Sequence, residues 1–196
     1  MKKVLFSSID GGSVHQGLIL AQLDEIMTIA QATSDIITLE VMTFAFAGTD
    51  IATAMETLVA QCDTIHIKIL ADWSQGAPKS PSVVSRLAAH PSGRITLKYK
   101  LDLPYSTDPI SERVSWRYHT SHGMLHHKTM LMTRAGHAER LILGSFNWSA
   151  RGAVAYENTL LLVRDGVTDV VLDAFCAEFA ALWGDFFASV APAQAA

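Results

Sequence analysis

A histidine and a lysine stand two residues apart in "LHHKTMLM", residues 125–132, which is otherwise apolar. The apolar pattern predicts a buried strand over this range, and side chains alternate between the two faces of a strand. His126 and Lys128 would then share one face, and His127 would point the other way. An imidazole beside an ammonium can bind and attack an anion. We interpret His127 as a core histidine bonded to the backbone.

More polar groups follow along the chain, each next to a predicted strand. Gly144, Ser145 and Asn147 come directly after a strand, in "GSFNWS". Glu157 precedes the first residue of the next strand, in "EN". All of them can lie at the same end of adjacent strands as His126. That end would present an imidazole, an ammonium, a hydroxyl, a carboxamide and a carboxylate.

This set of groups suits a phosphodiester. Its non-bridging oxygens need donors, and Lys128 and Asn147 supply fixed ones, which matter most as charge develops in the transition state. A large share of imidazole is uncharged near neutral pH, so His126 can act as a nucleophile. Glu157 is the local candidate to hold the far nitrogen of that ring. Because cationic side chains already neutralise the phosphate, we expect no metal and no cofactor.

The segments "HHK", "GSFNWS" and "EN" together resemble the signature of the phospholipase D superfamily, written HxKxxxxD, then GSxN and a downstream acid. The resemblance covers roughly residues 124–163. It is similar in style to the small bacterial endonucleases of that superfamily, which carry one motif per chain. It therefore implies a phospholipase D-like α/β fold and a nuclease-type phosphodiesterase.

The resemblance also implies a role for each residue. His126 is the nucleophile that forms a phosphohistidine, and Lys128 and Asn147 hold the phosphate oxygens. Ser145 helps to position the phosphate, and Glu157 orients His126. The family surrounds one phosphate with two motifs, so that one histidine attacks and the other protonates the leaving oxygen. Since this chain has one motif, the resemblance implies a two-fold homodimer in which both copies of His126 meet.

One position departs from the family pattern. The pattern has an aspartate five residues after the lysine, and this chain has Thr133 there. The family aspartate is thought to be mainly structural, so we expect an active enzyme. The alternative is a degenerate copy that binds nucleic acid as a dimer without cutting it.

A polar, irregular segment over residues 102–124 precedes the motif. Long loops without secondary structure in compact domains are often functional. Trp116 can stack on bases and Arg117 can face a nucleic-acid backbone, so we expect both to bind substrate. Packing remains the alternative for the tryptophan, and ion pairing with a nearby carboxylate remains the alternative for the arginine.

Strands alternate with helices along the whole chain, which predicts one α/β domain over residues 1–196. The expected architecture is a mixed sheet flanked by helices on both faces, with a frayed tail at 189–196. The last helix should bury Val171, Phe175, Phe179, Leu182 and Trp183. The predicted strands are 35–44, 64–70, 94–101, 125–132, 139–144 and 158–163, and the predicted helices are 17–33, 51–61, 82–90 and 168–188.

The composition is that of a folded domain, with 49% hydrophobic and 17% charged residues. No apolar run reaches the roughly 18–20 residues that span a membrane. The apolar stretch at the start ends at Phe6, which is shorter than the core of a signal peptide. We therefore expect a cytoplasmic protein without a membrane partner. Cys62 and Cys176 are expected to be buried, unpaired thiols.

Charge is distributed unevenly around a net value of −4. Residues 94–151 carry 9 Lys and Arg against 4 Asp and Glu, whereas both flanking regions are acidic. The basic block surrounds the motif, which favours nucleic acid, most of all DNA, as the substrate. The acidic ends suggest that a partner protein recruits the enzyme. A phospholipid-type phosphodiesterase is the alternative, but the polar segment 102–124 offers no apolar entry surface for a lipid.

Overall fold

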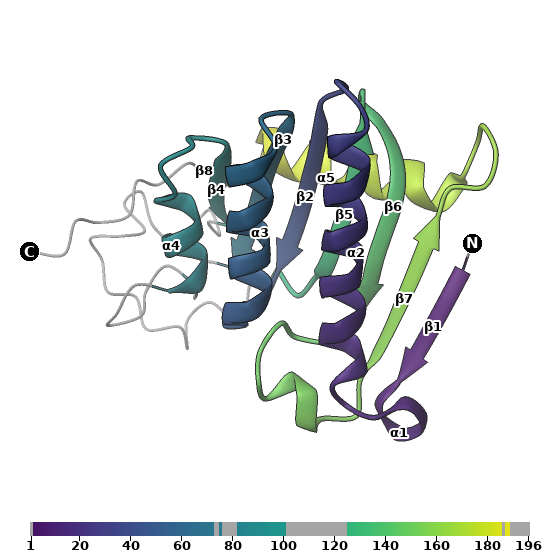
Figure 1. The fold of residues 1–196 in the computed structure, drawn as a ribbon. Helices are drawn as coiled ribbons and strands as arrows, with labels where there is room; N and C mark the ends of the chain where they lie inside the picture. Colours follow the sequence, from purple (N-terminus) through teal and green to yellow (C-terminus); the bar gives the residue numbers. More distant parts are fainter. Residues whose placement is uncertain (1, 73–74, 76–81, 101–124, 186, 189–196) are drawn as a thin grey trace, which may run out of the picture.

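The computed structural model describes residues 2–72, 75, 82–100, 125–185 and 187–188. These residues form one sheet of eight strands in the order β1-β7-β6-β5-β2-β3-β4-β8 (Figure 1). β2, β3 and β4 are parallel to one another, and all other neighbours are antiparallel. The strands are β1 (Lys2–Phe6), β2 (Ile37–Thr43), β3 (Ile65–Asp72), β4 (Ile95–Lys100), β5 (Lys128–Arg134), β6 (His137–Gly144), β7 (Asn158–Val163) and β8 (Phe187–Ala188).

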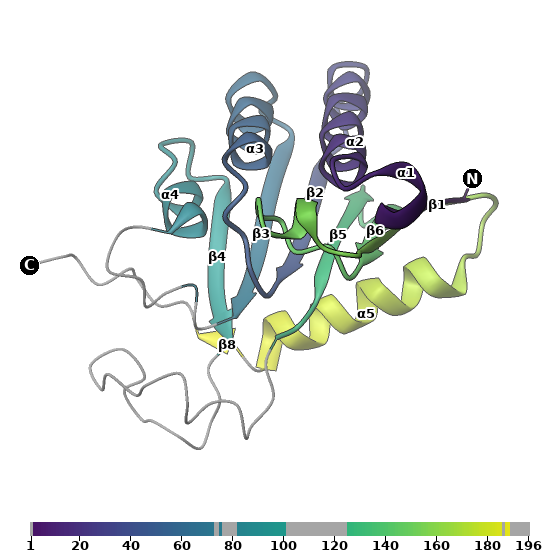
Figure 2. The same ribbon diagram turned by 90° about the horizontal axis from the view of Figure 1, so that it is seen from below.

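Helices cover both faces of the sheet, which confirms the predicted fold class. α2, α3 and α4 lie on one face, and α5 crosses the other (Figure 2). A short helix, α1, and a 3-10 turn, η3, lie at the end of the sheet that carries the motif (Figure 1). The bounds are α1 (Ser7–Asp10), α2 (Val14–Gln31), α3 (Thr49–Gln61), α4 (Val83–Ala88), η3 (Gly152–Val154) and α5 (Val170–Asp185).

Apolar periodicity explains how the two layers form. In β3, Ile65, Ile67 and Ile69 are fully buried in the core that the sheet shares with α2 and α3. His66 and Lys68 alternate with them and are only half-buried on the opposite face, as their positions in the strand predict. The alternation of side chains with a period of two therefore predicts which residues of this strand face the core.

The structure corrects several element boundaries. β5 begins at Lys128, so His126 and His127 precede the strand instead of lying in it. β1, α1 and β8 were not predicted. In α5, Val171 is 41% exposed, and its neighbour Leu172 is fully buried instead. A surface strand such as β1, with two lysines in five residues, carries too little apolar pattern to be recognised locally.

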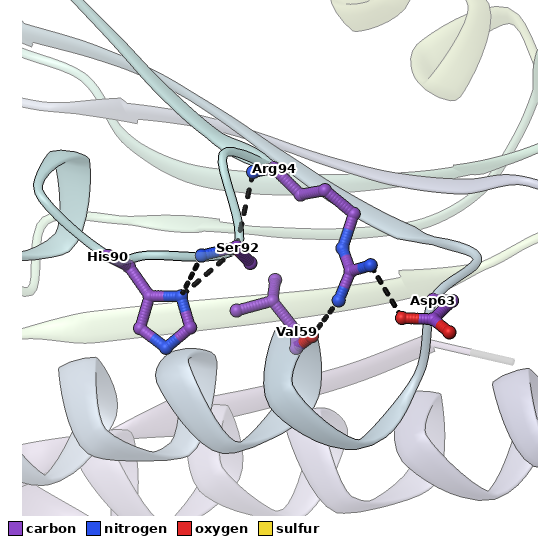
Figure 3. A network of polar contacts seen from close by, with 5 residues as sticks. All are labelled: Val59, Asp63, His90, Ser92 and Arg94. Carbon is purple, nitrogen blue, oxygen red and sulfur yellow. Dashed lines mark hydrogen bonds and ion pairs between the residues drawn. The ribbon is translucent and has the colours of Figure 1, made fainter.

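A polar network stabilises the other end of the sheet, where β3 and β4 begin (Figure 3). Arg94, just before β4, forms an ion pair with Asp63 at 2.6 Å and donates to the carbonyl oxygen of Val59. The Ser92 hydroxyl accepts a hydrogen bond from the Arg94 amide at 3.2 Å and contacts the His90 ring at 3.0 Å. These contacts tie the end of α3 to the turn before β4, so this network is structural.

No helix in the described part of the chain is long and apolar enough to cross a membrane. Cys62 is buried, Cys176 is partly buried, and both thiols are free. The predicted substrate-binding residues Trp116 and Arg117 lie outside the described residues, as does the predicted frayed tail at 189–196.

Candidate active site

The motif residues lie at one end of the strands of the sheet. β1, β2, β3 and β6 terminate at this end of the sheet, and β5 and β7 begin there (Figure 1). Lys128 is paired with Thr43 of β2, and Thr159 of β7 is paired with Gly144. The antiparallel pairing therefore brings the beginning of β5 and the end of β6 together, as expected from the sequence.

Lys128 is the first residue of β5 and is only 4% exposed. Its Nζ donates a hydrogen bond to the backbone oxygen of His126 at 2.6 Å and lies 5.2 Å from the centroid of the Phe44 ring. Burial lowers the pKa of this amine, and the charge of Glu157 opposes that shift. The site thus contains a desolvated cation, which suits an anionic substrate.

His126 is exposed and stands just before β5. Its ring lies 4.8 Å from the Phe44 ring, centroid to centroid, in a tilted arrangement. Partial desolvation of the ring and the charge of Lys128 lower the pKa of this imidazole, and Asp72 opposes the shift. A lowered pKa increases the uncharged fraction near neutral pH, which is the form that can act as a nucleophile. Phe44 therefore contacts both His126 and Lys128.

His127 differs from its sequence-based interpretation. Its ring is half-buried, and its Nδ1 is buried without a hydrogen bond to the described residues. The prediction of a bonded core histidine is therefore wrong for this atom. Burial lowers the pKa of His127, and Glu178 on α5 opposes that shift. His127 thus faces the α5 layer.

The loop after β6 holds Asn147 through its neighbour Trp148. Trp148 is 1% exposed, and its ring packs edge-on against Phe46 at 5.1 Å. Its carbonyl oxygen accepts hydrogen bonds from the amides of Ala47 and Gly48 at 2.8 and 2.7 Å. The Oδ1 of Asn147 is buried and makes no hydrogen bond within the described residues. This oxygen therefore does not hold the loop together. Binding of a phosphate oxygen by the Asn147 amide group stays a prediction.

Gly144 and Ser145, at the end of β6, contact the start of β7. A Cβ at Gly144 would stand 2.1 Å from the backbone oxygen of Asn158, so only glycine allows this approach. The Ser145 hydroxyl accepts a hydrogen bond from the Asn158 amide at 3.0 Å. Its proton remains available to donate to a phosphate oxygen.

Glu157 is half-buried and precedes β7. Its charge raises the pKa of both Lys128 and His15. The carboxylate that acts on His126 is Asp72. Orientation of His126 by Glu157 stays a prediction.

Three residues near the motif were not found from the sequence: Phe44, Asp72 and His15. Phe44 follows β2 and Asp72 ends β3, and the carboxyl ends of parallel strands are the usual place for ligand-binding residues. That rule would have drawn attention to both. Asp72 is 1% exposed, and its Oδ2 accepts a hydrogen bond from the Leu125 amide at 3.1 Å, directly before His126. His15 lies in α2, and no spacing in the sequence relates it to the motif.

Thr133, where the family pattern has aspartate, lies near the far end of β5. It stands five residues from Lys128, which corresponds to roughly 16 Å along a strand. Thr133 is 6% exposed, and its hydroxyl approaches the backbone oxygen of Thr38 at 3.5 Å. The substitution is therefore located in the sheet and not among the phosphate-binding groups.

Comparisons with known proteins agree with this arrangement. Residues 26–183 match the family model described as "Cardiolipin synthase, PLD-like domain". Nuc from Salmonella typhimurium, a phospholipase D family member, has a similar structure with a TM-score of 0.64 and 17% identity, over 97% of each chain. NucT from Helicobacter pylori aligns with a TM-score of 0.63 and 15% identity, over 97% of this chain and 99% of that one.

A larger protein contains the same fold. Polyphosphate kinase from Porphyromonas gingivalis aligns with a TM-score of 0.59 and 18% identity, over 99% of this chain but 27% of the kinase. No match is found among the curated proteins. At these identities the structural similarity concerns the fold alone, whereas the family model spans most of the chain. The protein is therefore a member of the phospholipase D superfamily.

Proposed function

We propose that this protein is a metal-independent phosphodiesterase that hydrolyses nucleic acid, with DNA as its principal substrate, through a phosphohistidine at His126. The observation that carries the proposal is that the exposed imidazole of His126 and the buried amine of Lys128 both lie against the Phe44 ring. Such a pair supplies a neutral nucleophile and a fixed cation for the same phosphate.

In the proposed first step, a ring nitrogen of His126 attacks phosphorus and forms a P–N bond as the P–O bond to the leaving oxygen breaks. Lys128 and Asn147 bind the non-bridging oxygens, and Ser145 donates a further hydrogen bond. The leaving oxygen takes its proton from His126 of a second copy. Water then attacks phosphorus and gives a proton to that second imidazole, and the P–N bond breaks.

The second copy is part of the proposal because one chain supplies one such histidine. An exposed apolar group lies at the same end of the sheet as the motif and consists of Phe6, Ile9, Val154 and Tyr156. We call it the apolar rim; its members are 45%, 79%, 87% and 91% exposed. Gly12 of the α1–α2 connection approaches the backbone of Ala153 so closely that a Cβ there would stand 1.7 Å from its oxygen. Ile9 in α1 and Val154 in η3 therefore lie on neighbouring elements, with Phe6 at the end of β1 and Tyr156 just after η3. We propose that a two-fold copy covers this rim and brings the imidazoles together.

Charge supports nucleic acid as the substrate class. Residues 94–151 contain 9 basic and 4 acidic residues; Lys128 of this block lies in the site, whereas Arg94, Arg134 and Arg140 form ion pairs with Asp63, Glu139 and Glu25. Phosphate backbones are attracted to such blocks, and the attraction weakens with salt. Because the remainder of the chain is acidic, we propose that a partner protein helps to recruit the enzyme to its substrate.

A second candidate is hydrolysis of a phospholipid-type phosphodiester. The apolar rim favours it, since a lipid substrate requires apolar surface beside the catalytic groups. The same surface fits the homodimer, so substrate assays must separate the two.

The test compares plasmid DNA, single-stranded DNA, RNA and phosphatidylglycerol vesicles, all in excess EDTA. We expect DNA cleavage that survives chelation, disappears in His126→Ala and persists in His137→Ala, which removes a histidine at the far end of the sheet. A quenched reaction should contain a protein–DNA adduct that is labile to acid. Headgroup release from vesicles without cleavage of nucleic acid would support the lipid alternative, and binding without cleavage of any substrate would contradict the enzyme proposal.

A further inference from the structure

His15 is a fully buried histidine in the first turn of α2, next to the end of the sheet that carries the motif. Both of its ring nitrogens are bonded: Nε2 lies 2.8 Å from the hydroxyl of Ser7, and Nδ1 lies 2.9 Å from the hydroxyl of Thr159. The ring stacks on Phe146, with 5.2 Å between the centroids. A buried histidine with both nitrogens bonded to hydroxyls on separate elements holds those elements in fixed relation.

Ser7 links this histidine to the acid of the motif. The Ser7 amide donates to the carbonyl oxygen of Glu157 at 3.0 Å, and the Glu157 amide donates to the Ser7 hydroxyl at 3.0 Å. The Ser7 hydroxyl also donates a hydrogen bond to the Glu157 carbonyl oxygen at 3.3 Å. Both backbone polar groups of Glu157 are therefore bound by one residue, which itself contacts His15.

The hydrogen bonds can be satisfied without a charge on the ring. If the Ser7 hydroxyl donates to Glu157, then Nε2 of His15 carries the proton and donates to Ser7. The Thr159 hydroxyl then donates to Nδ1. Burial lowers the pKa of His15, against the charges of Glu157 and Asp10, and so favours this neutral state.

The position of Glu157 matters because its carboxylate acts on Lys128. Glu157 raises the pKa of that buried amine and so favours the ammonium form that binds phosphate. A shift of the Glu157 backbone would move this charge relative to the amine. In a buried site such a displacement changes the electrostatic balance strongly.

We propose that His15 is a positioning residue for the reaction, which holds Ser7 and, through Ser7, fixes the backbone of Glu157, the acid of the motif. His15 touches no substrate. The kinetic part of this inference rests on the proposed function, but the structural part does not.

The variants separate positioning from simple packing. His15→Phe keeps the ring volume and the stack on Phe146 but removes both hydrogen bonds. Ser7→Ala removes the same link at a partly buried position, where loss of the fold is less of a risk. Leu23→Ala is the control, because Leu23 is 1% exposed in the same helix and packs in the hydrophobic core between the helix and the sheet.

The first measurement is amide hydrogen exchange, which needs no substrate. The Glu157 amide donates to Ser7, whereas the Ile67 amide, bonded to the Arg94 carbonyl oxygen at 2.9 Å, reports on the distant part of the sheet. We expect His15→Phe and Ser7→Ala to accelerate exchange at Glu157 relative to Ile67. Leu23→Ala should change both amides alike. An unchanged ratio in both test variants would overturn the inference.

The second measurement is kcat on the best phosphodiester substrate, alone and in a Glu157→Gln background. Misplacement of a catalytic group typically costs up to about 10²-fold, so we expect His15→Phe to lower kcat by roughly 10- to 100-fold. If His15 acts through Glu157, the same substitution should cost less than about twofold once Glu157 is replaced. Losses that multiply in the double variant would overturn the inference. A wild-type protein inactive on every substrate would instead refute the proposed function, and the exchange ratio would still decide the role of His15.

Discussion

Lys128 Nζ donates a hydrogen bond to the backbone carbonyl oxygen of His126 at 2.6 Å. The lysine that lowers the pKa of the imidazole therefore also fixes the chain segment that carries it. This contact gives Lys128 two roles, in electrostatics and in position, and neither depends on the presence of substrate.

Replacement of this lysine should change the titration of the histidine. Lys128→Met removes a charge that disfavours the imidazolium, so we expect the pKa of His126 to rise. Loss of one fixed donor to a developing charge typically costs about 10²–10³-fold in kcat, and we expect a loss of that order. Histidine NMR titration measures the first effect and steady-state kinetics the second. Lys68→Met, on the opposite face of the sheet, should change neither, and a lower pKa of His126 in Lys128→Met would contradict the assignment.

The pH profile of kcat/KM should be bell-shaped. The proposed first step requires one neutral and one protonated His126 in the dimer, so activity falls at low pH as the attacking ring gains a proton. It falls at high pH as the second ring loses its proton. Because burial and Lys128 lower the pKa of His126, we expect the maximum below the ordinary histidine value of about 6.5. A maximum above pH 8 would be incompatible with this assignment.

Gly144 should not accept a side chain. In Gly144→Ala the new Cβ would stand 2.1 Å from the Asn158 oxygen, so β6 and β7 must separate at the site. We expect a lower melting temperature and a loss of activity. Gly17→Ala is the matched control, because nothing lies within 4 Å of its added Cβ and alanine stabilises a helix interior by about 0.5–1 kcal/mol. Equal melting temperatures for the two variants would contradict the close approach.

Thr133 should be unimportant for the chemistry. Its place near the far end of β5 predicts that Thr133→Val leaves kcat within about twofold of the wild type. The lost hydroxyl contact with Thr38 is long, so the free energy of unfolding should change by less than about 1 kcal/mol. Parallel measurements of kcat and urea unfolding check this. A large loss of kcat at unchanged stability would place Thr133 in the mechanism.

The apolar rim should control the oligomeric state. Val154→Glu and Tyr156→Glu place a charge at exposed positions, so the monomer fold should tolerate them, but a dimer interface should not. We expect monomers by sedimentation and loss of cleavage, with nearly unchanged circular dichroism. Val167→Glu is the control, since Val167 is 95% exposed in the loop before α5. Monomers that cleave at the wild-type rate would exclude a shared site.

Residue types and local periodicity were sufficient to identify the motif and most of the sheet. The strands β3 and β4 were predicted because their apolar alternation is a local property, and β2 was predicted because its residues are apolar and β-branched. Gly144 was placed next to the motif from the sequence, and its contact with Asn158 explains why no side chain fits there. The start of β5 was missed, because pairing begins where Thr43 of β2 meets Lys128, and this partner is remote in sequence.

The sequence by itself determined which chemical groups the protein has and next to which strands they lie. Only the tertiary structure decided their neighbours: Phe44 against His126 and Lys128, Glu157 near Lys128, and His15 joined through Ser7 to Glu157. These relations depend on strand order, which places β1 beside β7 and β5 beside β2. Local pattern carries no information on that order, because it is set by long-range packing of apolar faces and pairing of strand edges.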